Sequence, residues 1–121
     1  MLNHNIKGTG ITVSDELHSY AKRRLSNAEK FLQQDPSVHV DIELEYSALR
    51  DGEKYRAEFT VAASGHIYRA SKWGESMHAA IDLAVGELVA ELGRNKKKRL
   101  HVLRRGGHRI KEYLRGWRDS L

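Results

Sequence analysis

Three carboxylates alternate along one predicted strand, Asp41, Glu43 and Glu45, and they are the residues best suited to acid–base chemistry. Paired carboxylates can serve as general acid and base when their environments separate their pKa values. These three occupy the polar positions of a strictly alternating segment, however, and such alternation is typical of a strand with one solvated face. We therefore interpret them as exposed, solvating residues that pair with Arg56 across the sheet.

The histidines and serines form no catalytic or metal-binding motif. The chain has seven histidines, but none are spaced i and i+4 on one helix and no His-Glu-x-x-His is present. It also has no Gly-x-Ser-x-Gly and no phosphate-binding glycine loop. The absence of cysteine excludes disulfides, cysteine-ligated zinc and a cysteine nucleophile, and it fits a reducing cytoplasm. We expect no enzyme, no metal site and no cofactor.

The cations of the chain gather in its last quarter. Residues 1–93 hold 10 Lys and Arg against 14 Asp and Glu, a net charge of −4, whereas residues 94–121 hold 11 against 2, a net charge of +9. The basic run from Arg94 to Arg99 is the densest part. Such a cluster favours a partner made of phosphates, because each neutralised phosphate releases condensed counterions. The alternative is a solvated, disordered basic tail.

A second pattern follows the Gly106-Gly107 break. Apolar residues recur at i, i+3, i+4 and i+7, at Ile110, Tyr113, Leu114 and Trp117. Basic residues stand between them, at Arg109, Lys111, Arg115 and Arg118. This spacing predicts a short basic amphipathic helix. The helix would dock on its own domain, fold on RNA with its aromatic rings stacked on bases, or bind an anionic membrane or a protein groove.

Hydrophobic periodicity predicts the elements that position these residues. A strand over 2–7 ends at a glycine turn, and a helix capped by Ser14 ends before Asp35-Pro36. Three strands follow over 38–46, 55–63 and 66–73, separated by short turns that favour an antiparallel meander. In the last strand Ile67 and Tyr68 are both candidates for the core, so its inward face is ambiguous.

A second helix is predicted after Ser76 and runs directly into the basic cluster. Its buried stripe consists of Met77, Ala80, Ile81, Ala84, Val85, Leu88 and Leu92. The fold class is therefore α+β, in the order β-α-β-β-β-α, with two helices packed on one face of a four-stranded sheet. The same order of helices and strands occurs in double-stranded RNA-binding domains. The length suits one domain over 1–99 with a basic C-terminal tail over 100–121.

Several segments of the body resemble the ribosome hibernation promoting factor family, also called ribosome-associated inhibitors. They are Ile6-Lys7-Gly8, Val13-Ser14, Ala28-Glu29-Lys30-Phe31 and Met77-His78-Ala79-Ala80-Ile81-Asp82 with the Lys-rich helix end after it. The resemblance covers about residues 2–99, and its most specific part is the Ala-Ala-Ile-Asp helix start together with the basic helix end. A short-type member is expected, because the 22 residues from 100 to 121 are too few for the dimerisation domain of long members.

The resemblance implies binding to the small ribosomal subunit in the channel used by messenger and transfer RNA. Such binding silences and protects idle ribosomes under stress. The family's basic contacts map onto Arg24, Arg94, Lys96 and Lys98. Charge and exposure add the other predicted RNA-binding residues, Lys22, Arg23, Lys97, Arg99, Arg104 and Arg105.

The implied partner is ribosomal RNA, with no membrane and no small-molecule substrate. No apolar run approaches the ~20 residues that span a bilayer, and the N-terminus lacks the apolar region of a signal peptide. We expect a cytoplasmic protein that is monomeric in solution. The competing interpretations are a general double-stranded RNA-binding module and a protein-interaction adaptor that uses the tail helix.

The chain departs from the family pattern at four positions. Ser76 and His78 stand where relatives commonly have Asp and Tyr, and Glu87 and Ala90 stand where relatives often carry basic residues. Ser76 is still expected to cap the second helix. The loss of two cations predicts a weaker RNA surface on that helix.

Overall fold

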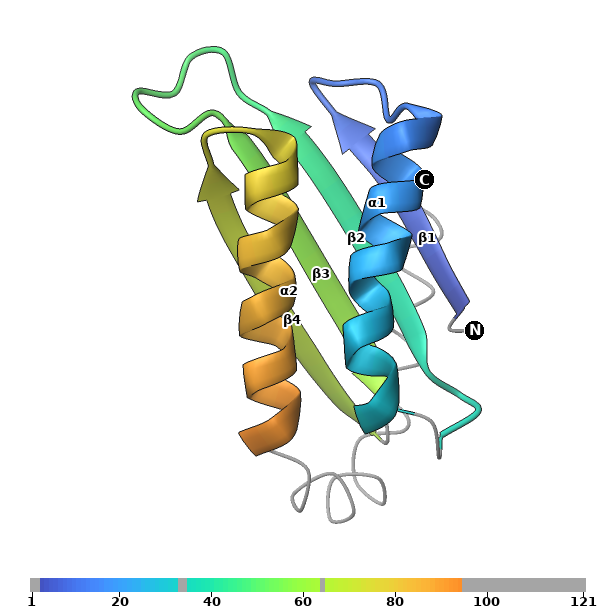
Figure 1. The fold of residues 1–121 in the computed structure, drawn as a ribbon. Coiled ribbons are helices and arrows are strands. Elements are labelled where there is room, and N and C mark those ends of the chain that lie inside the picture. The colour runs from blue at the N-terminus through green and yellow to red at the C-terminus, as the bar shows by residue number, and fades with distance from the viewer. Residues whose placement is uncertain (1–2, 33–34, 64, 95–121) are drawn as a thin grey trace.

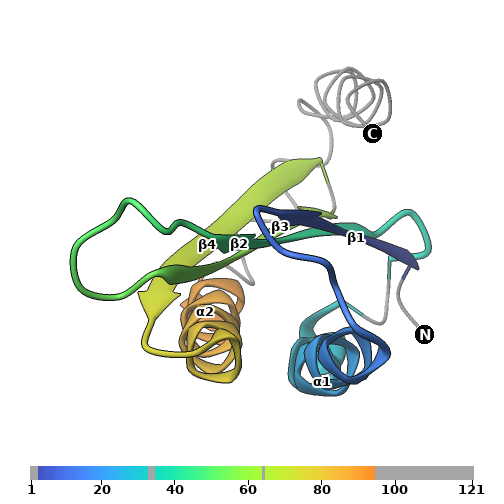
Figure 2. The same ribbon diagram turned by 90° about the horizontal axis from the view of Figure 1, so that it is seen from above.

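The computed structural model describes residues 3–32, 35–63 and 65–94. The elements, in order, are β1 (Asn3–Thr9), α1 (Asp15–Leu25), the 3-10 helix η1 (Ser26–Phe31), β2 (His39–Tyr46), β3 (Tyr55–Ala63), β4 (His66–Gly74) and α2 (Met77–Arg94). Figure 1 shows α1 and α2 lying side by side across the sheet, and Figure 2 shows both on the same face of it. The predicted fold class and element order are confirmed.

The four strands form one sheet in the order β1-β2-β3-β4. The last three strands are antiparallel neighbours, as the short turns predict. β1 lies at the edge and pairs parallel to β2, with Ile6 opposite Ile42. Parallel neighbours need a crossover connection, and α1 with η1 supplies it.

The first helical segment is not one continuous α-helix. The α-helical turns end at Leu25, and the tighter η1 continues to Phe31, before Asp35. The Ser26 hydroxyl donates to the Arg23 carbonyl oxygen at 2.5 Å, a local bond that competes with regular helix geometry. The tighter turns still bury Ala28 and Leu32 in the core.

The hydrophobic core fills the space between the helices and the inner face of the sheet. Every residue of the predicted α2 stripe is buried, from Met77 to Leu92. The ambiguity in β4 is resolved, because Tyr68 points into the core opposite Val61 while Ile67 is half-buried on the other face. Among the ranges described, no helix is long and apolar enough to cross a membrane.

Local signals at the helix starts behave as their residue types predict. The Ser14 hydroxyl oxygen accepts from the Leu17 amide at 3.1 Å, and the Ser76 hydroxyl oxygen accepts from the Ala79 amide at 3.0 Å. Ser76 therefore caps α2, as expected from its residue type. Gly10 has a φ of 70°, and a Cβ there would lie 2.3 Å from the Tyr46 carbonyl oxygen, so the turn after β1 requires glycine.

Candidate nucleic-acid interface

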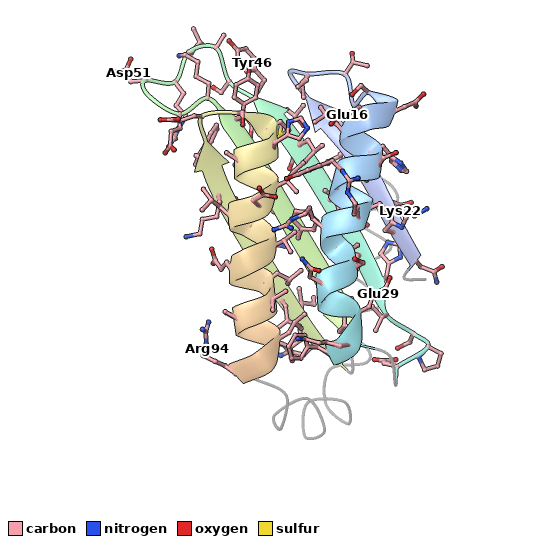
Figure 3. All side chains as sticks on the ribbon, viewed as in Figure 1. Glu16, Lys22, Glu29, Tyr46, Asp51 and Arg94 are labelled. Atoms are coloured by element: carbon pink, nitrogen blue, oxygen red, sulfur yellow. The ribbon has the colours of Figure 1, made fainter. Side chains whose placement is uncertain are left out.

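The C-terminal half of the first helical segment carries most of the cations on the helix side of the described structure. Lys22 and Arg24 are partly exposed, and Arg23 is exposed. In Figure 3 the labelled Lys22 points away from α2. Positions 22 and 24 are about 200° apart around an α-helix, so Arg24 faces the other way, toward α2. The three predicted cations of α1 therefore do not form a single cluster.

Arg24 is held between the two helices by a carboxylate. Its Nε lies 2.9 Å from Oδ1 of Asp82, and the Tyr20 hydroxyl donates to the same oxygen at 2.7 Å. The hydrogen bond to the Asp82 carboxylate, with burial and the negative charge, raises the pKa of Tyr20. A phosphate would have to share the Arg24 guanidinium with Asp82, so Arg24 binds a phosphate less strongly than an unpaired cation would.

His78 makes a contact between the helices that sequence reasoning missed. Its Nε2 lies 2.7 Å from Oε1 of Glu16, and its ring meets the Tyr20 ring edge-on with 4.5 Å between centroids. His78 thus contributes to the pairing of α1 with α2. Glu16 and His78 are 62 positions apart, so no local pattern in the sequence indicates their contact. The one signal in the sequence was that residue 78 departs from the family pattern.

The solvent face of α2 is acidic until its last turn. Asp82 pairs with Arg24, Glu87 lies 3.0 Å from Nζ of Lys72, and Glu91 lies 3.4 Å from Nη2 of Arg94. The Arg94 side chain is 66% exposed at the end of the helix, where Figure 3 labels it. The weaker basic surface expected from Glu87 fits this pairing. The other predicted contacts of this region lie outside the described residues: Lys96, Lys97, Lys98, Arg99, Arg104 and Arg105.

A shallow cavity of about 280 Å³ opens beside α1 and places two cations next to apolar surface. Its lining comes from β1, α1 and η1 and consists of His4, Ser19, Lys22, Arg23, Leu25, Ser26 and Glu29. The rings of His4 and His18 lie 5.7 Å apart at its edge. Apolar surface with rings and neighbouring cations suits an unstacked base and its phosphate.

The carboxylates of β2 are less exposed than the alternating pattern predicted. The pairing with Arg56 is confirmed for two of the three, since its guanidinium lies 3.0 Å from Glu43 and 2.6 Å from Glu45; it also approaches Glu58 at 3.4 Å, whereas Asp41 pairs with His39. The expectation of an exposed Asp41 is wrong, because this residue is 1% exposed. It lies between β1 and β3, opposite Asn5 and Thr60, and such crowding within the sheet is not visible in the alternation.

The environments of these carboxylates shift their pKa values in opposite directions. Burial raises the pKa of Asp41, against the hydrogen bond from His39, whose Nε2 lies 2.8 Å from Oδ1. Burial also acts to raise the pKa of Glu43, but the Thr9 hydroxyl at 2.6 Å and Arg56 outweigh it, so the net shift is downward. The carboxylates of β2 are therefore held in a network of hydrogen bonds and ion pairs. Within the described ranges no cluster of three or more His, Asp or Glu could hold a metal ion.

Residues 4–100 match the family model described as Sigma 54 modulation protein / S30EA ribosomal protein. The chain belongs to this family. The match covers the whole described fold except its first residue, including α1, the sheet and α2. The resemblance carried by the helix starts and the basic helix end is thereby confirmed.

Relatives of this S30EA chain include proteins named for ribosome hibernation. The ribosome hibernation promotion factor of Picosynechococcus sp. is 33% identical over 94 residues, which are 77% of this chain and 48% of that protein. The factor of the same name from Bacillus subtilis is 29% identical over 80% of this chain and 50% of its own length. The chain thus spans about half the length of both. The ribosome hibernation promoting factor of Azotobacter vinelandii is 31% identical over 79% of this chain and 84% of its own length.

Solved structures show the same S30EA fold. The N-terminal domain of Thermus thermophilus Protein Y superposes with a TM-score of 0.66 at 24% identity, covering 78% of this chain and 98% of that one. A ribosomal subunit interface protein from Coxiella burnetii gives a TM-score of 0.65 at 18% identity, covering 79% of this chain and 99% of that one. At these identities the likeness supports the fold.

Proposed function

We propose that this protein is a ribosome hibernation factor that silences and protects idle ribosomes under stress. The observation that carries the proposal is membership of the S30EA family over residues 4–100, with relatives named for ribosome hibernation. In this proposal the protein acts in the cytoplasm as a monomer. It occupies the channel for messenger and transfer RNA on the small subunit.

The charge distribution supports a binding role on ribosomal RNA. Lys22 points away from α2, Arg23 is exposed with its guanidinium over the Tyr20 ring, and Arg94 ends α2 immediately before the basic run in the sequence. Two separated cationic sites fix the orientation of a rigid domain on phosphates, and their affinity comes from counterion release. Occupancy of a channel needs no catalytic residue. Within the proposal, residues 1–99 are the ribosome-binding domain and residues 100–121 are a basic extension that adds Arg104 and Arg105.

Sedimentation with purified ribosomes tests the partner. The protein should migrate with the small subunit and with whole ribosomes in a sucrose gradient at physiological salt, and it should stay at the top with isolated large subunits. Recovery at the top in every gradient would refute ribosome binding. A variant with Arg69→Gln and Lys72→Gln is a control for net charge, because these cations lie on β4, away from α1 and the end of α2.

Competition tests the channel. Added protein should displace a fluorescent messenger RNA from small subunits. When the messenger RNA concentration exceeds the Kd of the messenger RNA for the subunit, the protein concentration that displaces half of the messenger RNA should rise in proportion to it. Simultaneous binding of both would place the protein elsewhere on the ribosome. Equal affinity for a free RNA duplex and for the small subunit would favour a general double-stranded RNA-binding module. Binding that is insensitive to salt would favour an apolar protein adaptor, because phosphate contacts weaken steeply with salt.

A further inference from the structure

The sheet has a second face that neither helix covers, as Figure 2 shows. The strand register places alternate residues of all four strands on this outer face. Two small side chains of β3 on this face, Thr60 and Ala62, are 1% and 2% exposed. Ala62 is not part of the hydrophobic core beneath the helices. Ala62 and the neighbouring half-buried Ile67 form an apolar strip on the face opposite the core, next to Thr60, whose hydroxyl accepts from Nε of Arg69.

A buried carboxylate beside this strip has one oxygen without a direct donor in the described fold, although the side chain of Asn5, opposite it on β1, favours its charged form. Asp41 is 1% exposed on the same face, and its Oδ1 is paired with His39. Its Oδ2 has no hydrogen-bond partner among the residues that the structure describes. Leaving a buried acceptor without a partner is unfavourable, and more so when the acceptor is charged. A cationic donor beside Oδ2 would therefore offset the cost of burying this carboxylate.

The charge of the outer face also limits what binds there. It carries four carboxylates against three cations: Asp41, Glu43, Glu45 and Glu58 against Lys7, Arg56 and Arg69. Arg56 is engaged by three of these carboxylates. A nucleic acid would bring phosphates against this group and be repelled. A basic amphipathic segment has the opposite charge and an apolar stripe to match.

The chain itself contains such a segment. Residues 95–121 carry 10 Lys and Arg against 2 Asp and Glu, and the stripe of Ile110, Leu114 and Trp117 lies within them. They follow α2, which ends at the same end of the sheet where β3 ends and β4 begins (Figure 1). That end of the outer face holds Ala62 and Ile67. The 16 residues from 95 to 110 reach roughly 50 Å when extended, several times the ~10 Å separation of packed layers.

We propose that residues 108–118 dock as an amphipathic helix on the outer face of the sheet. The apolar stripe covers Thr60, Ala62 and Ile67, and a cation of the segment donates to Oδ2 of Asp41. The chain then has three layers, with helices on both faces of the sheet. The basic residues 96–105 form the connection and stay available to phosphates. The docking is a property of the free protein and does not depend on the proposed function.

Paramagnetic relaxation in the full chain without ribosomes tests the docking. The sequence has no cysteine, so Ser120→Cys supplies a single site for a nitroxide at the end of the segment. The label should abolish most of the amide signal intensity at Thr60, Ala62 and Ile67 and leave α2 near Leu83 unchanged. Broadening on the helices, or none on the sheet, would overturn the proposal. A second sample mixes spin-labelled protein that contains no ¹⁵N with ¹⁵N-enriched protein that carries no spin label. Broadening in this mixture would assign the contact to a second copy of the chain and would also overturn the proposal.

Variants at both sides of the interface provide the controls. Leu114→Asn in the stripe should restore the signals of the outer face, whereas the same change at Glu112, off the stripe, should not. Both variants leave the described fold untouched. Ala62→Lys should likewise expel the segment, with Ser71→Lys as its control at an exposed position of the same face. Persistent broadening in Leu114→Asn would refute docking through the stripe. Because no ribosome is present, a failure here leaves the proposed function standing.

Discussion

Arg56 forms ion pairs with three carboxylates of β2 and β3. It lies within 3.4 Å of three carboxylates, and although burial opposes its charge, the bonds to Glu45 and Glu43 raise its pKa overall. Glu43 and Glu45 are thereby committed to ion pairs across the strands, and Glu58 to an ion pair within β3. The alternation of β2 predicts which side chains share a face. It does not predict how tightly the next strand packs around them.

Glu43→Gln is expected to lower the free energy of unfolding by about 1.5 to 3 kcal/mol at neutral pH, because it removes charge-assisted bonds with Arg56 and Thr9. The pKa of Glu43 is lower in the fold than its ordinary 4.5. Its stabilisation is therefore complete above about pH 4.5 and is lost as the pH falls through the folded-state pKa. Urea unfolding of both proteins from pH 7 to pH 3 should show the difference shrinking below that point.

Glu53→Gln in the exposed loop after β2 provides the matched control for Glu43. It should change the unfolding free energy by less than about 0.5 kcal/mol at neutral pH. A difference between wild type and Glu43→Gln that stayed constant down to pH 3 would contradict the ionic role of Glu43.

At the scale of elements, α2 has a buried face that the sequence predicted in full, and it has a glycine, Gly86, in its interior. Its stripe follows directly from the spacing of apolar residues, and its N-terminus is capped by Ser76. Gly86 is exposed on the opposite side, and a Cβ there would meet no atom within 4 Å. The glycine thus costs helix stability without a packing reason within the described fold.

Gly86→Ala is expected to raise the free energy of unfolding by roughly 0.5 to 1 kcal/mol, because alanine loses less backbone entropy in a helix. Chemical denaturation would measure it. Gly74→Ala is the matched comparison and should destabilise the protein, since a Cβ there would lie 2.7 Å from the Ala80 amide nitrogen. Destabilisation by Gly86→Ala would show that its exposed face makes a contact in solution.

The whole molecule has an acidic body and a basic end. The described residues hold 11 Lys and Arg against 14 Asp and Glu, whereas residues 95–121 hold 10 against 2. The helix side is itself mixed, because α2 carries Asp82 next to Arg24 of α1, Glu87 next to Lys72 of β4, and Glu91 next to Arg94. Affinity for a polyanion therefore depends most on the end of α2 and the run that follows it.

Neutralising Arg94, Lys96, Lys97 and Lys98 to Gln should weaken ribosome binding more than neutralising Lys22, Arg23 and Arg24. The first cluster is denser, and Arg24 already shares its charge with Asp82. Dissociation constants measured across a salt series should lose about one unit of slope for each phosphate contact removed. Equal losses from the two sets would contradict this ranking.

The sequence by itself determined the order of the elements, both helix caps and the apolar stripe of α2. These properties depend on periodicity and on residues a few positions apart, which physical chemistry constrains locally. The family also followed from short motifs along the body. The basic cluster was evident from composition alone, although most of it lies outside the described residues.

Only the tertiary structure decided how those residues are used. It placed β1 parallel to β2, turned Tyr68 and not Ile67 into the core, and buried Asp41 beside Thr60. It also brought Tyr20 within 2.7 Å of Asp82, 62 positions away. Local patterns specify which face of an element is apolar, but these contacts depend on strand register and on how two helices pack across a sheet. Packing therefore decided which charges are free to meet a partner and which are already paired.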